Sequence, residues 1–382
     1  RIFRKQSMTV ITSTMLLGGL FAVIYFYDSQ VFTNFNTMFV DFNVRSINSQ
    51  AEPSNSSLSY KFSWPNCGQN QSAANVTNFS SLPEIIRNFL YTRHCRHFPM
   101  LLDIPDKCGG PDTSADVFLL LVIKSLAVNY DRREVLRKTW AEERKHNGVW
   151  IRRLFIAGTK SSGSERERLN QLLKIEHREY NDILQWDFDD TFYNLTLKQM
   201  LFLEWMERNC PRARFLMNGD DDVLANTDNM VVYLQNLKDN DGSKHLFTGH
   251  LIHHVSPIRN PRSKYFVPVQ LHEPNVYPPY CGGGGFILSG YTASVIYNMS
   301  HSITFIPIDD VYMGMCLAKA KLQPSHHLGV RTAGLHIPSI DSYDPCYYKE
   351  MLLVHRFLSG DLYFMWHKLH DPNLNCSTST QM

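Results

Sequence analysis

Three adjacent carboxylates, Asp220, Asp221 and Asp222, follow a short apolar run in the chain. Like charges this close repel one another, so the cluster costs free energy unless a cation offsets it. In an extended segment the side chains of Asp220 and Asp222 share one face, and that of Asp221 points elsewhere. Carboxylates suit hard divalent cations such as Mg²⁺ or Mn²⁺, which also bind phosphate oxygens. The triplet therefore predicts a cation site that serves a sugar or phosphate, with a solvated acidic turn as the alternative.

A second candidate is the run at 277–286, which reads YPPYCGGGGF and holds four consecutive glycines. Glycine lets a backbone approach a ligand closely or adopt a positive φ, and the flanking aromatic rings could stack on a sugar. No Lys-Ser or Lys-Thr follows, so a Walker A loop is excluded. An apolar run begins at Phe286, which favours an ordered loop over a plain flexible turn.

Three further sets of charged or titratable residues have open readings. Asp309 and Asp310 precede a helical pattern, so one could cap the helix and the other could act as a general base toward a hydroxyl group. His355 follows an apolar stretch and is either a packed residue or a metal ligand. Lys124 ends an apolar run, and Arg133 lies on the helix expected next. These cations could hold a diphosphate or could simply be solvated.

The elements that must position these groups alternate between strands and helices. The run at 117–123 is apolar throughout, as in a strand buried on both faces of a parallel sheet. This alternation predicts βαβ units and an α/β sandwich. Ligands bind such sheets beyond the carboxyl ends of the strands, where the acidic triplet lies. We expect strands at 117–123, 153–158, 183–188 and 215–217, and helices at 83–98, 131–144, 165–180 and 195–208.

Composition narrows the class of protein. The 382 residues correspond to two or three domains at most, at about 150 residues per domain. Lys and Arg number 38 and Asp and Glu 36, and this balance argues against a nucleic-acid binder with a basic surface. Aromatic residues at 12% argue against a largely disordered chain. A mean hydropathy of −0.26 excludes a polytopic membrane protein but permits a single span.

Such a span is expected at 8–27, a run without a charged residue that Arg4 and Lys5 precede. About 20 residues suffice to cross the hydrocarbon core, and the basic flank places the N-terminus in the cytosol. A cleaved signal peptide is the alternative, but its apolar region is usually shorter. We therefore expect a cytosolic tail at 1–7, a signal anchor at 8–27, a luminal stem at 28–81 and a catalytic body at 82–382.

Cysteines and glycosylation sequons agree with a luminal body. The eight cysteines include no C-x-x-C pair, and their even number suggests disulfides in an oxidising compartment. They allow about 105 complete pairings, which the sequence leaves open. Three sequons within residues 70–80 suggest an exposed, glycosylated stalk. The glycosylation candidates are Asn70, Asn75, Asn78, Asn194 and Asn298, and further sequons begin at Asn55 and Asn375.

Taken together, these motifs resemble the β-1,3-glycosyltransferases of glycosyltransferase family 31. The resemblance covers residues 82–376 and is closest to the β-1,3-N-acetylglucosaminyltransferase branch, in particular to members that extend core 1 O-glycans. Asp309 stands where the galactosyltransferase branch usually has Glu. The matching pieces are FLLLVIKS at 118–125, RREVLRKTW at 132–140, DFDDTFYNLTLK at 187–198, NGDDDV at 218–223, YPPYCGGGGF at 277–286 and PIDDVYMGMC at 307–316.

The resemblance implies a GT-A fold, which is a Rossmann-like α/β/α sandwich, in a type II Golgi membrane protein. It implies UDP-GlcNAc as donor, Mn²⁺ as cofactor, and Asp222 and His355 as metal ligands. By motif position Asp310 would be the catalytic base. The residues implied to border the donor are Lys124, Arg133, Asp190, Asp220, Asp221, Gly283 and Gly284.

The function implied is inverting β-1,3 transfer of GlcNAc to a terminal galactose of a glycoprotein or glycolipid glycan. Core 1 O-glycans and poly-N-acetyllactosamine chains both remain open as acceptors. One alternative is a β-1,3-galactosyltransferase that uses UDP-galactose, and a less favoured one is a membrane-anchored lectin without activity. The chain departs from some relatives at Asn218 and at Leu224-Ala225, which puts the fine shape of the donor pocket in doubt.

Overall fold

The computed structural model describes residues 67–110, 112–160, 162–332 and 344–376. All of them belong to one compact unit, Phe62–Met382. The expected cytosolic tail at 1–7, the signal anchor at 8–27 and the stem up to residue 66 lie outside these ranges. Among the helices of the described ranges, none has the length and apolar character needed to span a bilayer.

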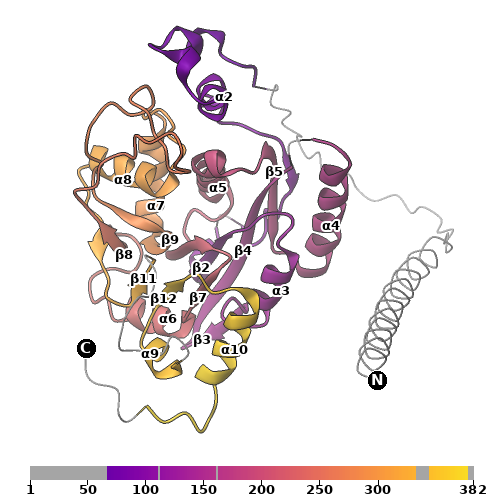
Figure 1. The fold of residues 1–382 in the computed structure, drawn as a ribbon. Coiled ribbons are helices and arrows are strands. Elements are labelled where there is room, and N and C mark those ends of the chain that lie inside the picture. The colour runs from indigo at the N-terminus through magenta and orange to yellow at the C-terminus, as the bar shows by residue number, and fades with distance from the viewer. Residues whose placement is uncertain (1–66, 111, 161, 333–343, 377–382) are drawn as a thin grey trace, which may run out of the picture. The chain divides into compact units, whose positions relative to one another are not determined.

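A mixed sheet forms the centre of the molecule (Figure 1). Its neighbouring strands run in the order β1-β5-β4-β2-β6-β9-β8-β10, and β3 pairs with β4. Strands β5, β4, β2 and β6 are parallel, whereas β9 is antiparallel to both β6 and β8. The bounds are β1 Met100–Leu102, β2 Val117–Lys124, β3 Arg144–His146, β4 Val149–Thr159, β5 Ile183–Asp189, β6 Phe215–Asp220, β8 Phe247–Ile252, β9 Tyr280–Ser289 and β10 Ser325–His326.

The strand order reverses beside β2. The chain moves outward from β2 to β4 and β5, and then returns to β6 on the other side of β2. A crevice opens at such a switch point because the connections on its two sides lead away from each other. Lys124 at the end of β2 is in register with Asp220 at the end of β6, so both residues reach this crevice.

A small second sheet completes the same end of the molecule. It consists of β11 (Val330–Arg331), β12 (Leu353–His355) and β7 (Val223–Ala225). Strand β12 is antiparallel to β7 and places His355 opposite Val223. The pairing therefore brings a histidine from a late part of the chain beside the acidic triplet.

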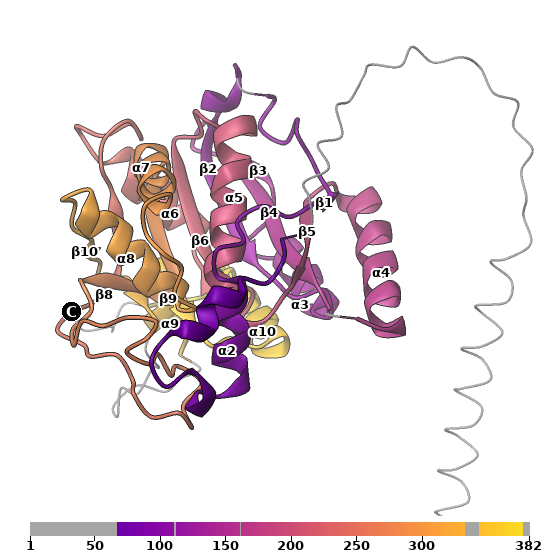
Figure 2. The same cartoon turned by 90° about the horizontal axis from the view of Figure 1, so that it is seen from above.

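Helices cover both faces of the central sheet. All of β2 is buried, and its alternate residues enter two cores: Leu120 and Val122 face one, and Leu119 and Leu121 face the other. Helix α5 lies between α7 and β4 on the first face (Figure 2). The helices of the first face are α2 (Glu84–Thr92), α5 (Leu195–Asn209), α7 (Gly290–Ser300) and α8 (Asp309–Lys319). Those of the second are α3 (Tyr130–Arg137), α4 (Ser164–Tyr180), α6 (Thr227–Gln235) and α10 (Ser359–Leu369), and the short α9 (Pro345–Lys349) adjoins them.

The expected alternation of strands and helices is confirmed, with three differences. Helix α3 ends at Arg137, because the Val135 carbonyl accepts both the Lys138 N–H and the Thr139 hydroxyl and the chain turns. Helix α2 spans only Glu84–Thr92. The glycine run expected in a loop is part of β9, where strand pairing with β6 and β8 holds it.

Disulfides connect segments that the helices and strands leave apart. The pairs are Cys67–Cys95, Cys108–Cys210 and Cys346–Cys376, while Cys281 and Cys316 are buried free thiols. The first pair joins residue 67 to the segment after α2, and the Asn70 N–H donates to the Tyr91 carbonyl of α2 itself. Folded structure thus begins before Leu82, in short 3-10 turns η2 (Gln71–Asn75) and η3 (Phe79–Ser81).

Candidate active site

A cleft of about 860 Å³ opens at the switch point between β2 and β6. Its floor is made by the ends of these strands, by the glycines of β9 and by the start of α8. Its outer walls come from β12 and from the connection between β8 and β9. The functional groups that line it are Lys124, Asp220, Asp222, Gly283, Gly284, Asp309, Asp310 and His355.

The acidic triplet divides its side chains between two sides, as the extended geometry predicts. Ligand atoms of Asp220, Asp222 and His355 lie within 4.8 Å of one another. Asp221 points the other way, where Arg132 Nη1 donates to its Oδ1 at 2.8 Å and Ser125 Oγ to its Oδ2 at 2.7 Å. Asp221 thus anchors the loop after β2. To contact a bound sugar nucleotide, as the sequence suggested, its carboxylate would first have to break these hydrogen bonds.

The donor set of Asp220, Asp222 and His355 fits a divalent cation. His355 Nε2 lies 3.2 Å from Asp222 Oδ1 and 3.9 Å from Asp220 Oδ2. Its Nδ1 lies 3.2 Å from the Thr332 carbonyl, which can only accept, so Nδ1 carries the proton and Nε2 presents a lone pair. A backbone carbonyl that fixes the tautomer in this way is typical of histidine ligands. Asp222 Oδ1 is buried, and the described residues give it no hydrogen bond of good geometry.

Charge interactions in this cluster are strong. Burial opposes the charged form of every member, but the adjacent Asp222 carboxylate raises the pKa of His355. The same contact lowers the pKa of Asp222 below its ordinary value despite burial. Burial raises the pKa of Asp220, and the neighbouring Lys124 ammonium only partly offsets this effect. A cation placed among these three groups would relieve the carboxylate repulsion.

Lys124 links the triplet to the start of α8. Its Nζ lies 2.7 Å from Asp309 Oδ2 and 3.1 Å from Asp220 Oδ1, and the residue is only 5% exposed. Burial opposes its charge, yet the two carboxylates raise the pKa of Lys124 well above its ordinary range. The sequence suggested that one aspartate of the 309–310 pair caps α8. In the structure Asp309 pairs with Lys124, the N-cap residue Ile308 has no capping side chain, and Asp310 accepts the Val311 N–H of the first turn.

Asp310 faces the cleft without a cation of its own. Its Oδ1 accepts the Val311 N–H at 2.7 Å, and the Gly283 N–H adds a second backbone bond. Burial and the charge of Asp309 raise the pKa of Asp310 to about 7, because these bonds offset only part of the penalty. A carboxyl group with such a pKa can accept a proton at neutral pH, which a general base must do.

The glycines of β9 let Asp310 and His355 approach the strand. A Cβ at Gly284 would lie 2.6 Å from His355 Cγ, and one at Gly283 would lie 3.2 Å from Asp310 Oδ2. Side chains at Gly282 and Gly285 would collide with Thr332 and Leu353. The run is therefore required by close packing around the site and not by flexibility.

Two residues that were expected to border the sugar-nucleotide donor bind other parts of the protein instead. Arg133 is fully buried and uses all its donors on Glu176, on Ser125 and on the Leu126 and Ala127 carbonyls, so none is left for a diphosphate. Asp190 accepts from the Gly158 N–H at 2.8 Å and pairs with Lys198 at 2.7 Å.

The sequons are spread over the surface of the described part. Asn70, Asn75, Asn78 and Asn298 are exposed. Asn194 is half-buried, and its amide donates to the Asp189 carbonyl at 2.7 Å. Asn55 lies outside the described residues.

The sequence analysis did not predict one part of the cleft wall. Tyr265 and Phe192 pack edge to face with ring centroids 5.4 Å apart, and the Lys264 ammonium lies 4.8 Å from the Tyr265 ring. All three line the cleft, although Lys264 and Tyr265 come from the irregular connection between β8 and β9. That connection has no periodic pattern, so no sequence signal marked it. An aromatic wall with an ammonium group suits a polar ring such as a sugar.

The chain is similar over most of its length to several β-1,3-N-acetylglucosaminyltransferases. The human N-acetyllactosaminide β-1,3-N-acetylglucosaminyltransferase 3 is 51% identical over 319 residues, which cover 83% of this chain and 84% of that protein. The human acetylgalactosaminyl-O-glycosyl-glycoprotein β-1,3-N-acetylglucosaminyltransferase is 48% identical and covers 82% and 81% of the two chains. The mouse UDP-GlcNAc:βGal β-1,3-N-acetylglucosaminyltransferase 7 is 42% identical and covers 83% and 79%.

A solved 4-diphosphocytidyl-2C-methyl-D-erythritol synthase from Anaerococcus prevotii is 11% identical over 56% of this chain and 89% of that chain. Its TM-score of 0.31 is too low to carry an argument. The sequence profile of the galactosyltransferase family matches residues 131–328. This segment includes both the acidic triplet and Asp310. With this match and relatives at 42–51% identity over most of the chain, the protein belongs to the galactosyltransferase family, glycosyltransferase family 31.

Proposed function

We propose that the protein transfers GlcNAc from UDP-GlcNAc to the 3-hydroxyl group of a terminal galactose, with inversion to a β linkage. The observation that carries this proposal is the placement of the Asp220–Asp222–His355 cluster and the uncompensated Asp310 in one cleft. The cluster could hold the cation that binds a nucleoside diphosphate, and Asp310 could accept the proton of an acceptor hydroxyl group. GlcNAc and the β-1,3 linkage are proposed because the relatives are named for them.

In this proposal Asp222 and His355 hold Mn²⁺, with Asp220 beside them. When bound, the cation would offset the negative charge that grows on the leaving diphosphate. Lys124 keeps Asp220 and Asp309 in place through its two ion pairs. The central α/β sheet with helices on both faces is consistent with a GT-A arrangement of this kind.

Asp310 removes the proton from the acceptor hydroxyl group. The acceptor oxygen forms a bond to the anomeric carbon of GlcNAc from the face opposite UDP, while the bond from that carbon to the diphosphate oxygen breaks. UDP leaves with the bonding electrons, and Asp310 retains the proton. Galactose-terminated core 1 O-glycans and N-acetyllactosamine chains are the proposed acceptors, since two relatives are named for acetylgalactosaminyl-O-glycosyl-glycoprotein and for N-acetyllactosaminide.

We place the enzyme on the luminal side of the Golgi membrane, with residues 8–27 as a type II signal anchor. The uncharged run and its basic flank support the anchor. Three disulfides support an oxidising compartment. Selective permeabilisation with a protease protection assay tests the orientation, since a luminal body stays intact until the Golgi membrane is opened.

The test of the reaction offers UDP-GlcNAc and UDP-galactose separately, with a galactose-terminated disaccharide and either Mn²⁺ or EDTA. We expect a Mn²⁺-dependent gain of one N-acetylhexosamine in product mass. A gain of one hexose would instead establish the galactosyltransferase alternative. Folded protein that releases no UDP with either donor, yet still binds the glycan without metal, would overturn the proposal in favour of a lectin.

A further inference from the structure

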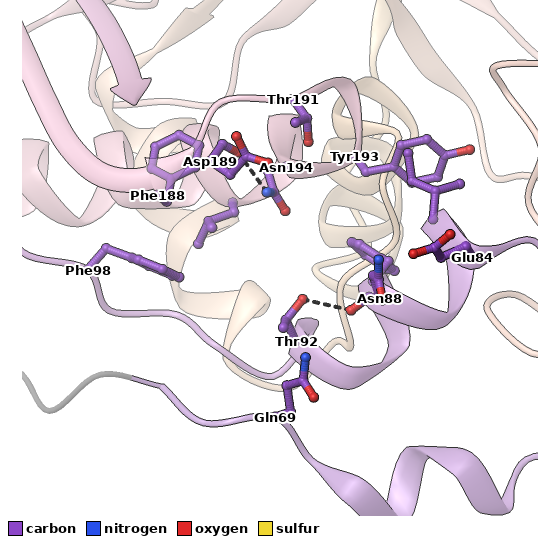
Figure 3. A pocket seen from close by; sticks show the side chains of 13 residues that line it. Gln69, Glu84, Asn88, Thr92, Phe98, Phe188, Asp189, Thr191, Tyr193 and Asn194 are labelled. Carbon is purple, nitrogen blue, oxygen red and sulfur yellow. Dashed lines mark hydrogen bonds between the residues drawn. The ribbon is translucent and has the colours of Figure 1, made fainter. Parts of the chain in front are cut away.

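A second pocket of about 610 Å³ lies outside the catalytic cleft, between α2 and the segment that leads from β5 into α5 (Figure 3). Its volume falls within the about 300–1,000 Å³ that is typical of small-molecule sites. The proposed reaction uses none of the residues that line it. The rim is open to solvent on the α2 side, where Gln69, Glu84, Ile85, Asn88 and Thr92 are exposed.

Aromatic rings form one part of the lining. Phe98 and Phe188 pack edge to face with centroids 6.0 Å apart, and Phe89 lies 6.4 Å from Tyr193 across the other side. Figure 3 shows Phe98, Phe188 and Tyr193 around the cavity, together with the polar side chains of the rim. Such rings provide apolar faces against which a ring bearing C–H groups can stack.

Polar groups without protein partners form the rest. The side chains of Gln69, Glu84, Asn88 and Thr191 make no hydrogen bond within the described residues, and neither does the Tyr193 hydroxyl group. Amide, carboxylate and hydroxyl groups together can both donate to and accept from a ligand with many hydroxyl groups. Glu84 and Asp189 make the rim acidic, which disfavours a phosphate or another anion. The lining therefore fits a neutral saccharide.

The pocket is the neighbour of the catalytic cleft. The short turn η5 (Phe192–Asn194) separates the two: Phe192 and Leu195 line the cleft, whereas Tyr193 and Leu197 line the pocket. A glycan chain that reaches the cleft with one end can therefore pass over this turn with a residue further along.

We infer that this pocket is a second saccharide-binding site, which holds a neutral part of the acceptor glycan remote from the reacting galactose. That the ligand is part of the acceptor glycan rests on the proposed function, whereas the existence of a binding site is inferred from the residues that line the pocket. The competing occupant is a glycan attached to Asn194, whose sequon lies in the pocket wall. Against that occupant, the Asn194 amide is already bonded to the Asp189 carbonyl and is part of the wall.

The first test measures binding and needs no catalysis. The probe is a neutral N-acetyllactosamine-type tetrasaccharide that ends in GlcNAc, so it offers no terminal galactose to the cleft. Its affinity is compared by titration among wild-type protein, Glu84→Ala/Asn88→Ala and the matched control Asn236→Ala, which alters an exposed residue outside both cavities. The alanines lie on the exposed side of α2, where alanine favours the helix, so we expect all three proteins to fold.

We expect wild type and Asn236→Ala to bind alike and the double variant to bind about tenfold more weakly or worse. Equal binding by all three proteins, or no binding by wild type, would overturn the inference. Asn194→Gln separates the two occupants: if only this variant binds the probe, the protein's own glycan fills the pocket and the acceptor subsite is refuted.

The second test uses turnover. With an acceptor of several N-acetyllactosamine repeats, the double variant should raise KM several-fold and leave kcat unchanged, while KM for a disaccharide acceptor stays the same. A rise for both acceptors would indicate damage to the cleft and contradict the inference. Absence of transfer by wild type would refute the proposed function but would leave the binding result standing.

Discussion

Two groups of buried charges lie on opposite sides of the loop after β2, and they differ in how their charges are compensated. Behind the loop, Arg133 and Arg137 share Glu176, and Arg137 also pairs with Asp182. Arg153 completes this network with a 2.7 Å contact to Asp182. In front of the loop, the cleft collects Asp220, Asp222, Asp309 and Asp310 around Lys124 and His355.

The pKa of Asp182 in the network is lowered, whereas in the cleft only Asp222, beside His355, has a lowered pKa and two other carboxyl groups have raised ones. Burial opposes ionisation in both, but Arg137 and Arg153 lower the pKa of Asp182 in the network. In the cleft, burial raises the pKa of Asp220, and that of Asp310 rises to about 7. The network is therefore complete within the protein, whereas the cleft has an excess of negative charge. This difference sets the cleft apart as the candidate site, because strongly perturbed carboxyl groups in a cleft are typical of functional sites.

The largest effect should come from Asp310→Asn, which keeps the shape of the side chain but removes the base. We expect kcat to fall by about 10²–10⁴-fold, while the protein folds and still binds UDP with Mn²⁺. Steady-state kinetics and UDP titration measure the two quantities. Asp309→Asn is the matched neighbour, and its kcat should fall less because Asp309 pairs with Lys124. The opposite ranking would assign the base to Asp309.

Breaking the complete network should affect stability instead. Glu176→Gln leaves Arg133 and Arg137 without their shared counter-charge, so we expect a loss of about 3–5 kcal/mol in the free energy of unfolding. Urea denaturation measures it. Glu165→Gln on the same helix α4 is the control, because its side chain is 54% exposed and its change should stay within about 0.5 kcal/mol. Equal midpoints for the two variants would refute the comparison.

Gly284→Ala tests the packing of β9 against His355. Its Cβ would come within 2.6 Å of the imidazole, so we expect His355 to shift and Mn²⁺ affinity to fall by about 10–100-fold. Mn²⁺ titration of activity measures this, with Gly360→Ala as control because that position has open space around it. Unchanged affinity in Gly284→Ala would remove His355 from the metal site.

The smallest effect is a gain in stability. Between the unfolded pKa near 3.8 and the folded pKa of about 7, folded Asp310 binds a proton that the unfolded chain releases. The free energy of unfolding therefore falls as pH rises through this range. Asp310→Asn removes this decrease, because the amide does not ionise. At pH 8 we expect this variant to be more stable by about 1–2 kcal/mol, with no advantage at pH 3.5. Thermal unfolding at both values measures the difference, and a variant less stable at pH 8 would contradict it.

Much of the central sheet could be predicted, because burial on both faces leaves an apolar run such as that of β2. The division of the triplet could also be predicted, since alternation along an extended segment is a local property. The glycine run was expected to be a loop because glycine carries no pattern that distinguishes a strand from a turn. Its place in β9 depends on pairing with β6 and β8, which are far away in sequence.

The roles of charged residues were harder to predict. Arg133 looked available to a diphosphate because the sequence does not show that Glu176 lies opposite it. One aspartate of the 309–310 pair was expected to cap the helix, but the sequence does not show that Asp309 lies beside Lys124 at the end of β2. The three disulfides could not be chosen from the many pairings for the same reason: each depends on tertiary proximity.

The antiparallel pairing of β12 with β7 has a consequence for biosynthesis. Asp222 leaves the ribosome long before His355, so the nascent protein carries the acidic triplet without its imidazole. Only docking of the later segment supplies the third ligand atom. At the proposed metal site, tight Mn²⁺ binding would therefore arise only late in maturation, once the C-terminal part has reached its native place.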